Sequence, residues 1–212
     1  LRCRWRGSVS MAIQSWGSSR QWHNTFASGG QFELDVKNLV NQYTGNVWHS
    51  VRIETLLTAK GSTEMDIVFC LGGSIYILEL KRVRRIKGSY RDGRWVMYGW
   101  RSTRDEEGQY NAQNVIEQNN IHARSLADAY YASYRCWPTI IPLVIVPDNC
   151  EYGDDLKTSV YTVGDLERFL RTCGGVTDKR TLLRITYLLG GETPVRQRPD
   201  FVSLRSGLRG KK

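Results

Sequence analysis

The chain has 212 residues, of which 41% are hydrophobic and 24% are charged, a composition typical of a globular protein with one principal domain. Its formal charge of +9 and pI near 9.5 favour a polyanionic partner such as nucleic acid. The five cysteines form no CxxC pair or other metal-spaced cluster, which argues against a structural zinc or iron–sulfur site and indicates a reduced, intracellular protein. No apolar run approaches the ~20 residues that a membrane-spanning helix needs.

The chain opens with a basic segment, and the elements after it follow from the spacing of apolar residues. This segment loosely resembles an organelle transit segment, but organelle targeting is not the expectation. The first predicted elements are a helix over 30–44, a strand over 46–54 and two strands around Gly72-Gly73. A basic hairpin over 84–99, with Asp92-Gly93 as its turn, a helix over about 108–134 and a buried strand over 139–147 follow. The last predicted elements are a helix over 162–172 opened by a capping box, a helix from 177 to 190 and a basic tail from 192.

The Gly72-Gly73 pair separates "EMDIVFCL" from "SIYILELK" and predicts a hairpin with a two-residue turn. Strands that pair symmetrically about this turn place Asp66 opposite Glu79. The alternation of side chains then predicts one face with Glu64, Asp66, Val68, Cys70, Ile75, Ile77, Glu79 and Lys81, and another with Met65, Ile67, Phe69, Tyr76, Leu78 and Leu80.

Two carboxylates directly across a strand pair, with Cβ atoms roughly 5 Å apart, repel each other. A hard divalent cation such as Mg²⁺ would remove the repulsion between Asp66 and Glu79, because such ions prefer carboxylate and carbonyl oxygens. The alternative is a solvated face on which charged residues have no special role, which is the commoner arrangement. Val68, Ile75 and Ile77 on the same predicted face favour a partly buried site over that alternative.

The predicted order of helix, three strands, long helix and strand, with carboxylates at these positions, resembles the nuclease-related domain (NERD) family of the PD-(D/E)xK nuclease superfamily. The matching motifs are "GGQFELDV", "TEMDIVF", "LELK", "DGRW" and "NVIEQNNIHARSL", within roughly residues 28–147. Two positions depart from the family pattern: Val115 replaces the proline after Asn114, and Phe32 replaces a glycine before Glu33. The resemblance implies an α/β, restriction-endonuclease-like αβββαβ core with a mixed central sheet flanked by helices, followed by C-terminal helices and a basic tail.

The resemblance also implies a Mg²⁺- or Mn²⁺-dependent nuclease that hydrolyses phosphodiester bonds of DNA or RNA, with DNA favoured. Asp66, Glu79 and the backbone carbonyl of Leu80 would hold the ion, and Glu33 would reach it directly or through a water. Lys81 would orient the attacking water or neutralise the scissile phosphate. The predicted catalytic residues are Glu33, Asp66, Glu79, Lys81 and Gln118.

Asn114, Gln118 and His122 recur at intervals of four residues and so form one row on the predicted helix. Gln118 is predicted to contact the bound phosphate or backbone, with Asn114 and His122 in supporting roles. A buried His122 with one satisfied hydrogen bond and no role in the site is an equal alternative. Glu33 could instead be an exposed helix residue paired with Lys37.

A basic and aromatic segment follows the predicted hairpin and indicates nucleic-acid binding, since cations bind phosphates and aromatic rings stack on unstacked bases. This combination favours single-stranded or frayed nucleic acid. For the individual aromatic residues, packing within the second hairpin is an equal alternative. The residues predicted to bind nucleic acid are Arg82, Arg84, Arg85, Lys87, Arg94 and Trp95.

Two other functions remain open at the level of sequence. One is a nucleic-acid-binding module that keeps the nuclease fold without catalysis, which the intact carboxylate and lysine set argues against. The other is a viral cap-snatching-type endonuclease, in which His23 or His49 would be an extra ligand; the predicted helix motif favours the NERD interpretation. The predicted organisation is a basic extension over 1–27, a nuclease core over 28–147, a helical extension of the same domain over 148–191 and a basic, flexible tail over 192–212.

Overall fold

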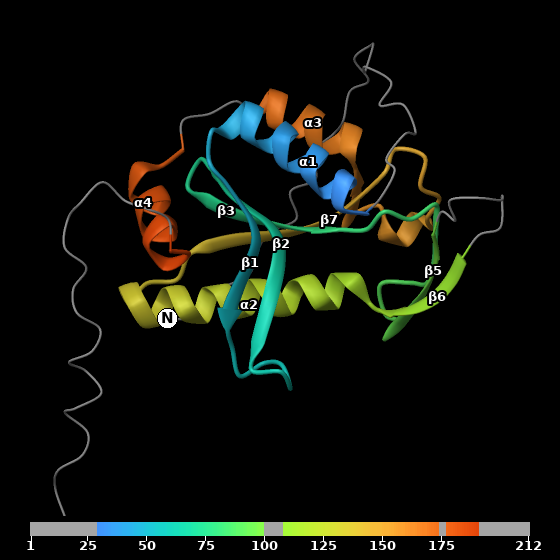
Figure 1. Cartoon of the computed structure of the whole chain (residues 1–212), viewed down its shortest axis with the longest axis horizontal. Coiled ribbons are helices and arrows are strands. Elements are labelled where there is room, and N and C mark those ends of the chain that lie inside the picture. The colour runs from blue at the N-terminus through green and yellow to red at the C-terminus, as the bar shows by residue number, and fades with distance from the viewer. Residues whose placement is uncertain (1–28, 100–107, 174–176, 191–212) are drawn as a thin grey trace, which may run out of the picture.

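A mixed five-stranded sheet forms the centre of the computed structural model, which describes residues 29–99, 108–173 and 177–190 (Figure 1). Its order is β1-β2-β3-β7-β8; β1, β2 and β3 are antiparallel neighbours, whereas β7 and β8 run parallel to β3. The strands are β1 (Val47–Glu54), β2 (Ser62–Leu71), β3 (Ser74–Leu80), β7 (Thr139–Val146) and β8 (Val160–Thr162). β3 therefore lies at the middle of the sheet.

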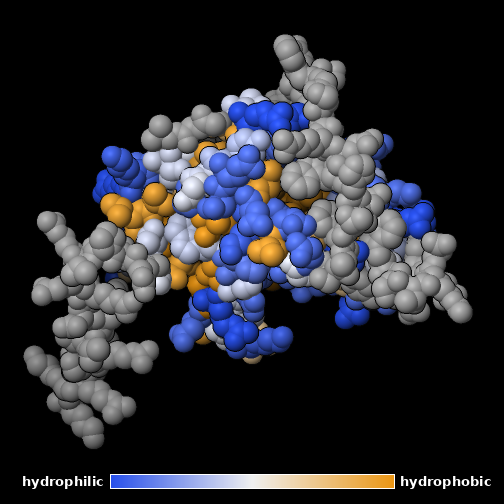
Figure 2. All heavy atoms as spheres, turned by 45° about the horizontal axis from the view of Figure 1, so that its top comes forward, coloured by the Kyte–Doolittle hydropathy of each residue, from blue (hydrophilic) through white to orange (hydrophobic). Residues whose placement is uncertain are grey.

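Helices cover both faces of this sheet (Figure 1). On one face, α1 (Gly29–Thr44) packs its predicted apolar stripe against β2 and β3, and α3 (Val163–Thr172) lies beside it. On the other face, α2 (Val115–Tyr134) and α4 (Lys179–Leu188) bury a second apolar cluster. The solvent side of the layer with α1 and α3 is largely hydrophilic, with small apolar areas between polar ones (Figure 2). The αβββαβ core predicted from the sequence is confirmed.

A second sheet is inserted between β3 and α2. It consists of β4 (Arg85–Lys87), β5 (Arg94–Gly99) and β6 (Gly108–Gln113), paired in the order β4-β5-β6. One side of this small sheet joins the start of α2 and the ends of β7 and β8 in a third buried cluster, which includes Ile86, Trp95, Met97, Val115, Val146, Leu156 and Val160.

Two local predictions in this region are wrong. The helix predicted to start near residue 108 begins at Val115, because residues 108–113 pair with β5 and Asn114 caps the helix by accepting the N–H groups of Ile116 and Glu117. Asp92-Gly93 is not the turn of the basic hairpin, since Lys87 pairs with Val96 and leaves a six-residue connection over 88–93. The Asp92 carboxylate accepts the backbone N–H of Ser89 and so stabilises an earlier turn.

The predicted turn at Gly72-Gly73 and its register are confirmed, with Cys70 opposite Ile75 and Val68 opposite Ile77. The predicted faces fail at the start of β2, where Met65 packs in the cluster under α2 with Val68, and not with Ile67 and Phe69. Strict alternation is therefore lost between positions 65 and 68. Ser50, which stands opposite Asp66 in the register of β1 and β2, has a φ of 51°, a left-handed conformation that is unusual for serine and breaks the regular pleat.

The elements after β7 agree with the sequence predictions in part. The capping box at Thr162 and Asp165 is present as predicted, and the last helix starts at Lys179 after an Asp178 cap. The sequence patterns did not predict β8 or the short 3₁₀ helix Asp154–Leu156.

No helix in the described part of the chain is long and apolar enough to cross a membrane. The basic extension over 1–27 and the basic tail over 192–212 lie outside the described residues.

Candidate active site

The two carboxylates that the hairpin was predicted to bring together lie where the pairing of β2 and β3 ends. The ladder of the hairpin runs from Leu71 and Ser74 to Ile67 and Leu78 and does not include Asp66 and Glu79. Instead, the backbone N–H of Leu80 donates to Asp66 Oδ2 at 2.7 Å. This bond fixes the half-buried Asp66 side chain against β3, one residue from Glu79, so the two acids share a site without forming a ladder pair.

Glu79 is 1% exposed and has different surroundings at its two oxygens. Its Oε1 accepts from Lys81 Nζ at 2.5 Å and from Gln118 Nε2 at 3.0 Å. Its Oε2 lies 3.2 Å from His122 Nε2, but without the alignment of a hydrogen bond, and no donor in the described part of the chain satisfies it. Because a buried carboxylate oxygen without a donor is costly, a further positive group is expected there.

The electrostatics of the two acids differ. Burial, and then the charge of Glu79, raise the pKa of Asp66 to about 6, against an ordinary value of 3.8; the Leu80 N–H and Lys81 offset part of this rise, and Glu33 adds to it. Burial also acts to raise the pKa of Glu79, but His122 and Lys81 together outweigh it and hold the pKa of that carboxyl below its ordinary range. The site therefore keeps Glu79 ionised and makes a second negative charge on Asp66 unfavourable.

This donor set fits a hard divalent cation. Two carboxylates and an unsatisfied buried oxygen suit Mg²⁺ or Mn²⁺, because Mg²⁺ is commonly bound through one or two carboxylates and keeps several waters. Among the residues that the structure describes, no three His, Cys, Asp or Glu side chains stand close enough to form a ready-made metal cluster. The Leu80 carbonyl as a ligand stays a prediction.

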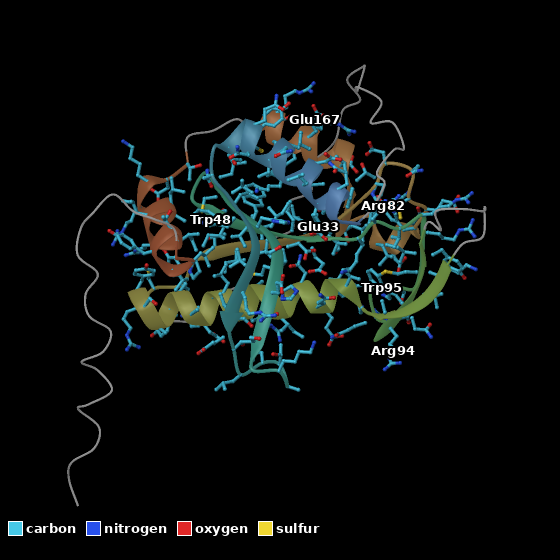
Figure 3. The ribbon with its side chains drawn as sticks, in the orientation of Figure 1. Glu33, Trp48, Arg82, Arg94, Trp95 and Glu167 are labelled. Carbon is cyan, nitrogen blue, oxygen red and sulfur yellow. The ribbon has the colours of Figure 1, made fainter. Side chains whose placement is uncertain are left out.

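Glu33 projects from α1 (Figure 3) and is close enough for its charge to contribute to the raised pKa of Asp66. Its carboxylate pairs with His49 Nε2 at 3.5 Å, and both side chains are about one-third exposed, at 35% and 30%. The paired residue is thus His49 on β1, which the sequence analysis considered only as an extra ligand in the cap-snatching alternative, and the alternative pairing with Lys37 is not seen. The register that places His49 opposite Ile67, next to Asp66, could not be read from local patterns. His23 lies outside the described residues.

Of the three polar residues predicted to form a row on α2, two reach the site. Gln118 and His122, one turn apart, both face Glu79. Asn114 is the helix cap and does not reach Glu79; its amide donates to the Tyr90 and Asp92 carbonyls and holds the 88–93 connection to the helix. Asn119 and Thr63 are buried polar residues to which the sequence analysis assigned no role. Asn119 donates to the Leu143 carbonyl of β7 at 2.9 Å, and Thr63 Oγ1 lies 2.6 Å from His122 Nδ1.

The structure separates the residues predicted to bind nucleic acid. Trp95 is fully buried, its indole N–H donates to the Ser89 carbonyl, and a side chain at Gly88 would lie 2.5 Å from its ring. Stacking of a base on Trp95 is therefore a wrong prediction, and the packing alternative holds. Arg82 and Arg84 are half-buried in the connection before β4. Arg85 pairs with Glu151 at 2.7 Å.

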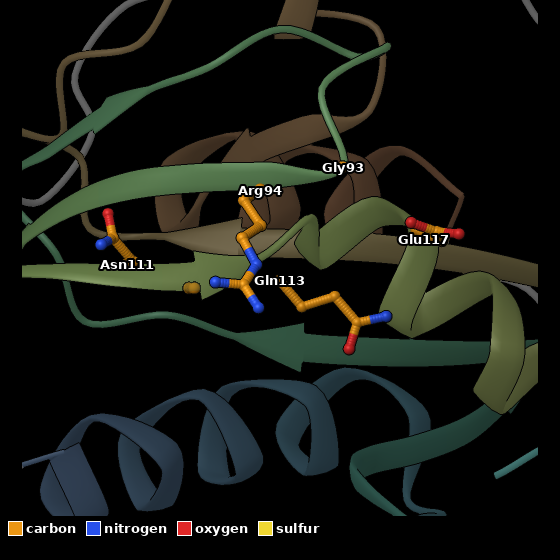
Figure 4. Close-up of a pocket in the computed structure, with 6 residues that line it drawn as sticks. Gly93, Arg94, Asn111, Gln113 and Glu117 are labelled. Carbon is orange, nitrogen blue, oxygen red and sulfur yellow. The ribbon is translucent and has the colours of Figure 1, made fainter.

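The side of the small sheet away from Trp95 carries exposed polar groups. We call this the outer face; its residues alternate with the buried ones and are Arg85, Lys87, Arg94, Val96, Tyr98, Asn111 and Gln113. Lys87 Nζ lies 5.1 Å from the centre of the Tyr98 ring. At one end of the outer face, an open pocket of about 440 Å³ is lined by Gly93, Arg94, Asn111, Ala112, Gln113 and Glu117 (Figure 4). Glu117 lines this pocket, whereas Gln118, the next residue of α2, points about 100° away around the helix and contacts Glu79.

Fold and site together define a nuclease-related α/β domain. A family model described as the nuclease-related domain, NERD, matches residues 28–147, and the chain belongs to this family. No curated protein and no solved structure matches the chain.

The raised pKa of Asp66 predicts how the metal-free protein responds to pH. In EDTA, the unfolding free energy should fall as pH rises from 4.5 to 7.5, because Asp66 ionises with a pKa of 3.8 in the unfolded chain but about 6 in the folded one. Asp66→Asn removes this loss, so relative to wild type the variant should gain about 1–2 kcal/mol over that range. Urea unfolding at both pH values measures the difference. Asp128→Asn, at an exposed position of α2, is the control; parallel behaviour of wild type and Asp66→Asn would contradict the site electrostatics.

Proposed function

We propose that this protein is a Mg²⁺- or Mn²⁺-dependent nuclease that hydrolyses phosphodiester bonds. One observation carries the proposal: two acids share a buried site, and Glu79 has an oxygen that no described donor satisfies, beside a lysine. A cation held by Asp66 and Glu79 would supply Lewis-acid activation of water and stabilise the negative charge that gathers on the phosphate. The family match supports this assignment, since its description is nuclease-related.

The side chains around the acids have roles that follow from their positions. Lys81 Nζ is held by Glu79 Oε1 and is about a quarter exposed, at 25%. An ammonium in that position can donate to a phosphate oxygen or to the attacking water. Gln118 is half-buried, and its amide nitrogen donates to Glu79 and also lies 3.4 Å from His122 Nε2. Its amide oxygen is the group proposed to contact a donor on the scissile nucleotide, directly or through a water. Glu33, paired with His49, lies further out and would act through a water.

The outer face and its pocket are the proposed path for the nucleic acid beyond the scissile phosphate. Lys87 and Arg94 are exposed cations there, and Tyr98 supplies the aromatic surface that Trp95 does not. In the register, Arg94 pairs with Gln113, so a guanidinium and an amide stand side by side at the pocket (Figure 4). Such groups donate to phosphate oxygens and to base edges. We propose DNA as the first substrate, with RNA as the alternative, and an intracellular location.

Replacing Glu79 separates cleavage from binding. Glu79→Gln should lower Mn²⁺-dependent cleavage by about 100-fold or more, because it removes one ligand charge. Nucleic-acid binding should stay within about threefold of wild type, since the outer face is unchanged. Labelled single- and double-stranded DNA and RNA, with Mn²⁺ or EDTA, measure cleavage, and filter binding measures affinity.

Glu54→Gln, an exposed acid at the end of β1, is the matched control and should cleave like wild type. Full cleavage by Glu79→Gln would overturn the site assignment. If wild type binds these substrates but cuts none of them, the protein is a binding module on a nuclease fold.

Charge reversal tests the outer face. The double variant Lys87→Glu, Arg94→Glu should bind nucleic acid at least about tenfold more weakly and lower the slope of log affinity against log salt by about 1.4–1.8, because two phosphate contacts are lost. The control Lys179→Glu, Arg180→Glu makes the same change of charge on α4, at the opposite end of the molecule (Figure 1). Filter binding across a salt series compares them. Equal losses in both variants would mean that only the net charge matters and that the outer face is not the path.

A further inference from the structure

Thr63 is a polar residue near the start of β2 that the proposed chemistry does not use. It is 7% exposed, and its hydroxyl lies 2.6 Å from His122 Nδ1. The structure gives this hydroxyl no other hydrogen-bond partner among the described residues. As a β-branched residue in a strand, Thr63 has few side-chain rotamers, so its oxygen stays in place.

The hydrogen-bond partners of the imidazole favour one position for its proton. A buried hydroxyl must donate its hydrogen or lose the free energy of an unmade bond, and Nδ1 is the acceptor within reach. An imidazole that accepts at Nδ1 carries its proton on Nε2 when it is neutral. His122 is 4% exposed, so water does not compete readily for either nitrogen.

The second nitrogen of the same ring faces Glu79. Nε2 lies 3.2 Å from Oε2, the oxygen that lacks a hydrogen-bond donor. With the proton on Nε2, the N–H dipole attracts this oxygen even without full alignment. The opposite tautomer would place a nitrogen lone pair against a carboxylate, which is repulsive. The Gln118 amide nitrogen also lies 3.4 Å from His122 Nε2 and would favour an unprotonated Nε2. That amide already donates to Glu79 Oε1 at 3.0 Å, so the charged carboxylate at 3.2 Å is the stronger influence on Nε2. Lys81 and Gln118 donate to Oε1 of Glu79, and the ring is the described group beside its other oxygen.

We propose that Thr63 is a positioning residue for the active site: it selects the Nε2–H tautomer of His122 and thereby fixes the orientation of Glu79. It touches neither the nucleic acid nor the cation, and it acts through the histidine. Partners one step removed from a ligand orient that ligand and typically change metal affinity by about 10–100-fold when removed. The inference on the metal rests on the proposed function, whereas the tautomer does not.

The tautomer of His122 is measured directly on the metal-free protein. Long-range ¹H–¹⁵N correlation spectra at pH 8 in EDTA, assigned with His122→Gln, should show the neutral ring with its proton on Nε2. Thr63→Ser keeps the hydroxyl and should keep this tautomer, while Thr63→Val should give a mixture. A wild-type ring protonated on Nδ1 would overturn the proposal, and this result requires no variant of Thr63 to fold.

Metal affinity and kinetics test the consequence for Glu79. With Mn²⁺ as the probe, the concentration needed for half of the melting shift should rise about tenfold in Thr63→Val and stay within twofold in Thr63→Ser. Cleavage by Thr63→Val should fall in kcat with KM for the nucleic acid unchanged, because Thr63 makes no substrate contact. An unchanged Mn²⁺ response in a folded Thr63→Val would overturn the positioning role. If wild type shows the Nε2–H tautomer but neither Mn²⁺ response nor cleavage, the proposed function fails while the tautomer assignment stands.

Discussion

The repulsion between the carboxylates of Asp66 and Glu79 is the constraint on which the rest of the site depends. Both lie in a partly or fully buried region, where water screens their charges poorly. The protein keeps Glu79 ionised with Lys81 and His122 beside it and leaves the cost on Asp66, whose pKa rises to about 6. Since a domain is stable by only about 5–15 kcal/mol, retaining such a pair is a substantial cost for which structure alone offers no return. A cation bound between the two carboxylates would offset this cost by neutralising their repulsion.

The fold holds this pair in place from three sides. β3 is central in the sheet, so Glu79 has β2 on one side and β7 on the other. The Leu80 N–H fixes Asp66 from the strand itself. α2 supplies Gln118 and His122, and Asn119 on the same helix bonds to the β7 backbone, which sets the helix against the sheet. The inserted small sheet shares its buried cluster with the first turn of α2, so the proposed nucleic-acid path and the carboxylate site belong to one packed body.

The sequence predicted those parts of the fold and site that short-range rules decide. The Gly72-Gly73 turn fixes the register of β2 and β3, and the apolar stripe of α1 and the capping box of α3 are readable within one or two turns of chain. The predictions that failed concern residues whose structure depends on partners far away in the sequence. Residues 108–113 became a strand because β5 offers an edge, and Trp95 became core because β7, β8 and α2 close over it. Thr63 and His49 acquired their partners on α2 and α1 through registers and packing that no local pattern encodes.

The location of a bound cation tests the central claim most directly. Crystals of the protein soaked in Mn²⁺ near pH 7.5 and measured at a wavelength where manganese scatters anomalously would place the ion without reference to activity. The account predicts an anomalous peak about 2 Å from one oxygen of Asp66 and one of Glu79, with Glu79 Oε2 among the contacts. Manganese bound elsewhere, or absent while both carboxylates keep their present contacts, would contradict it.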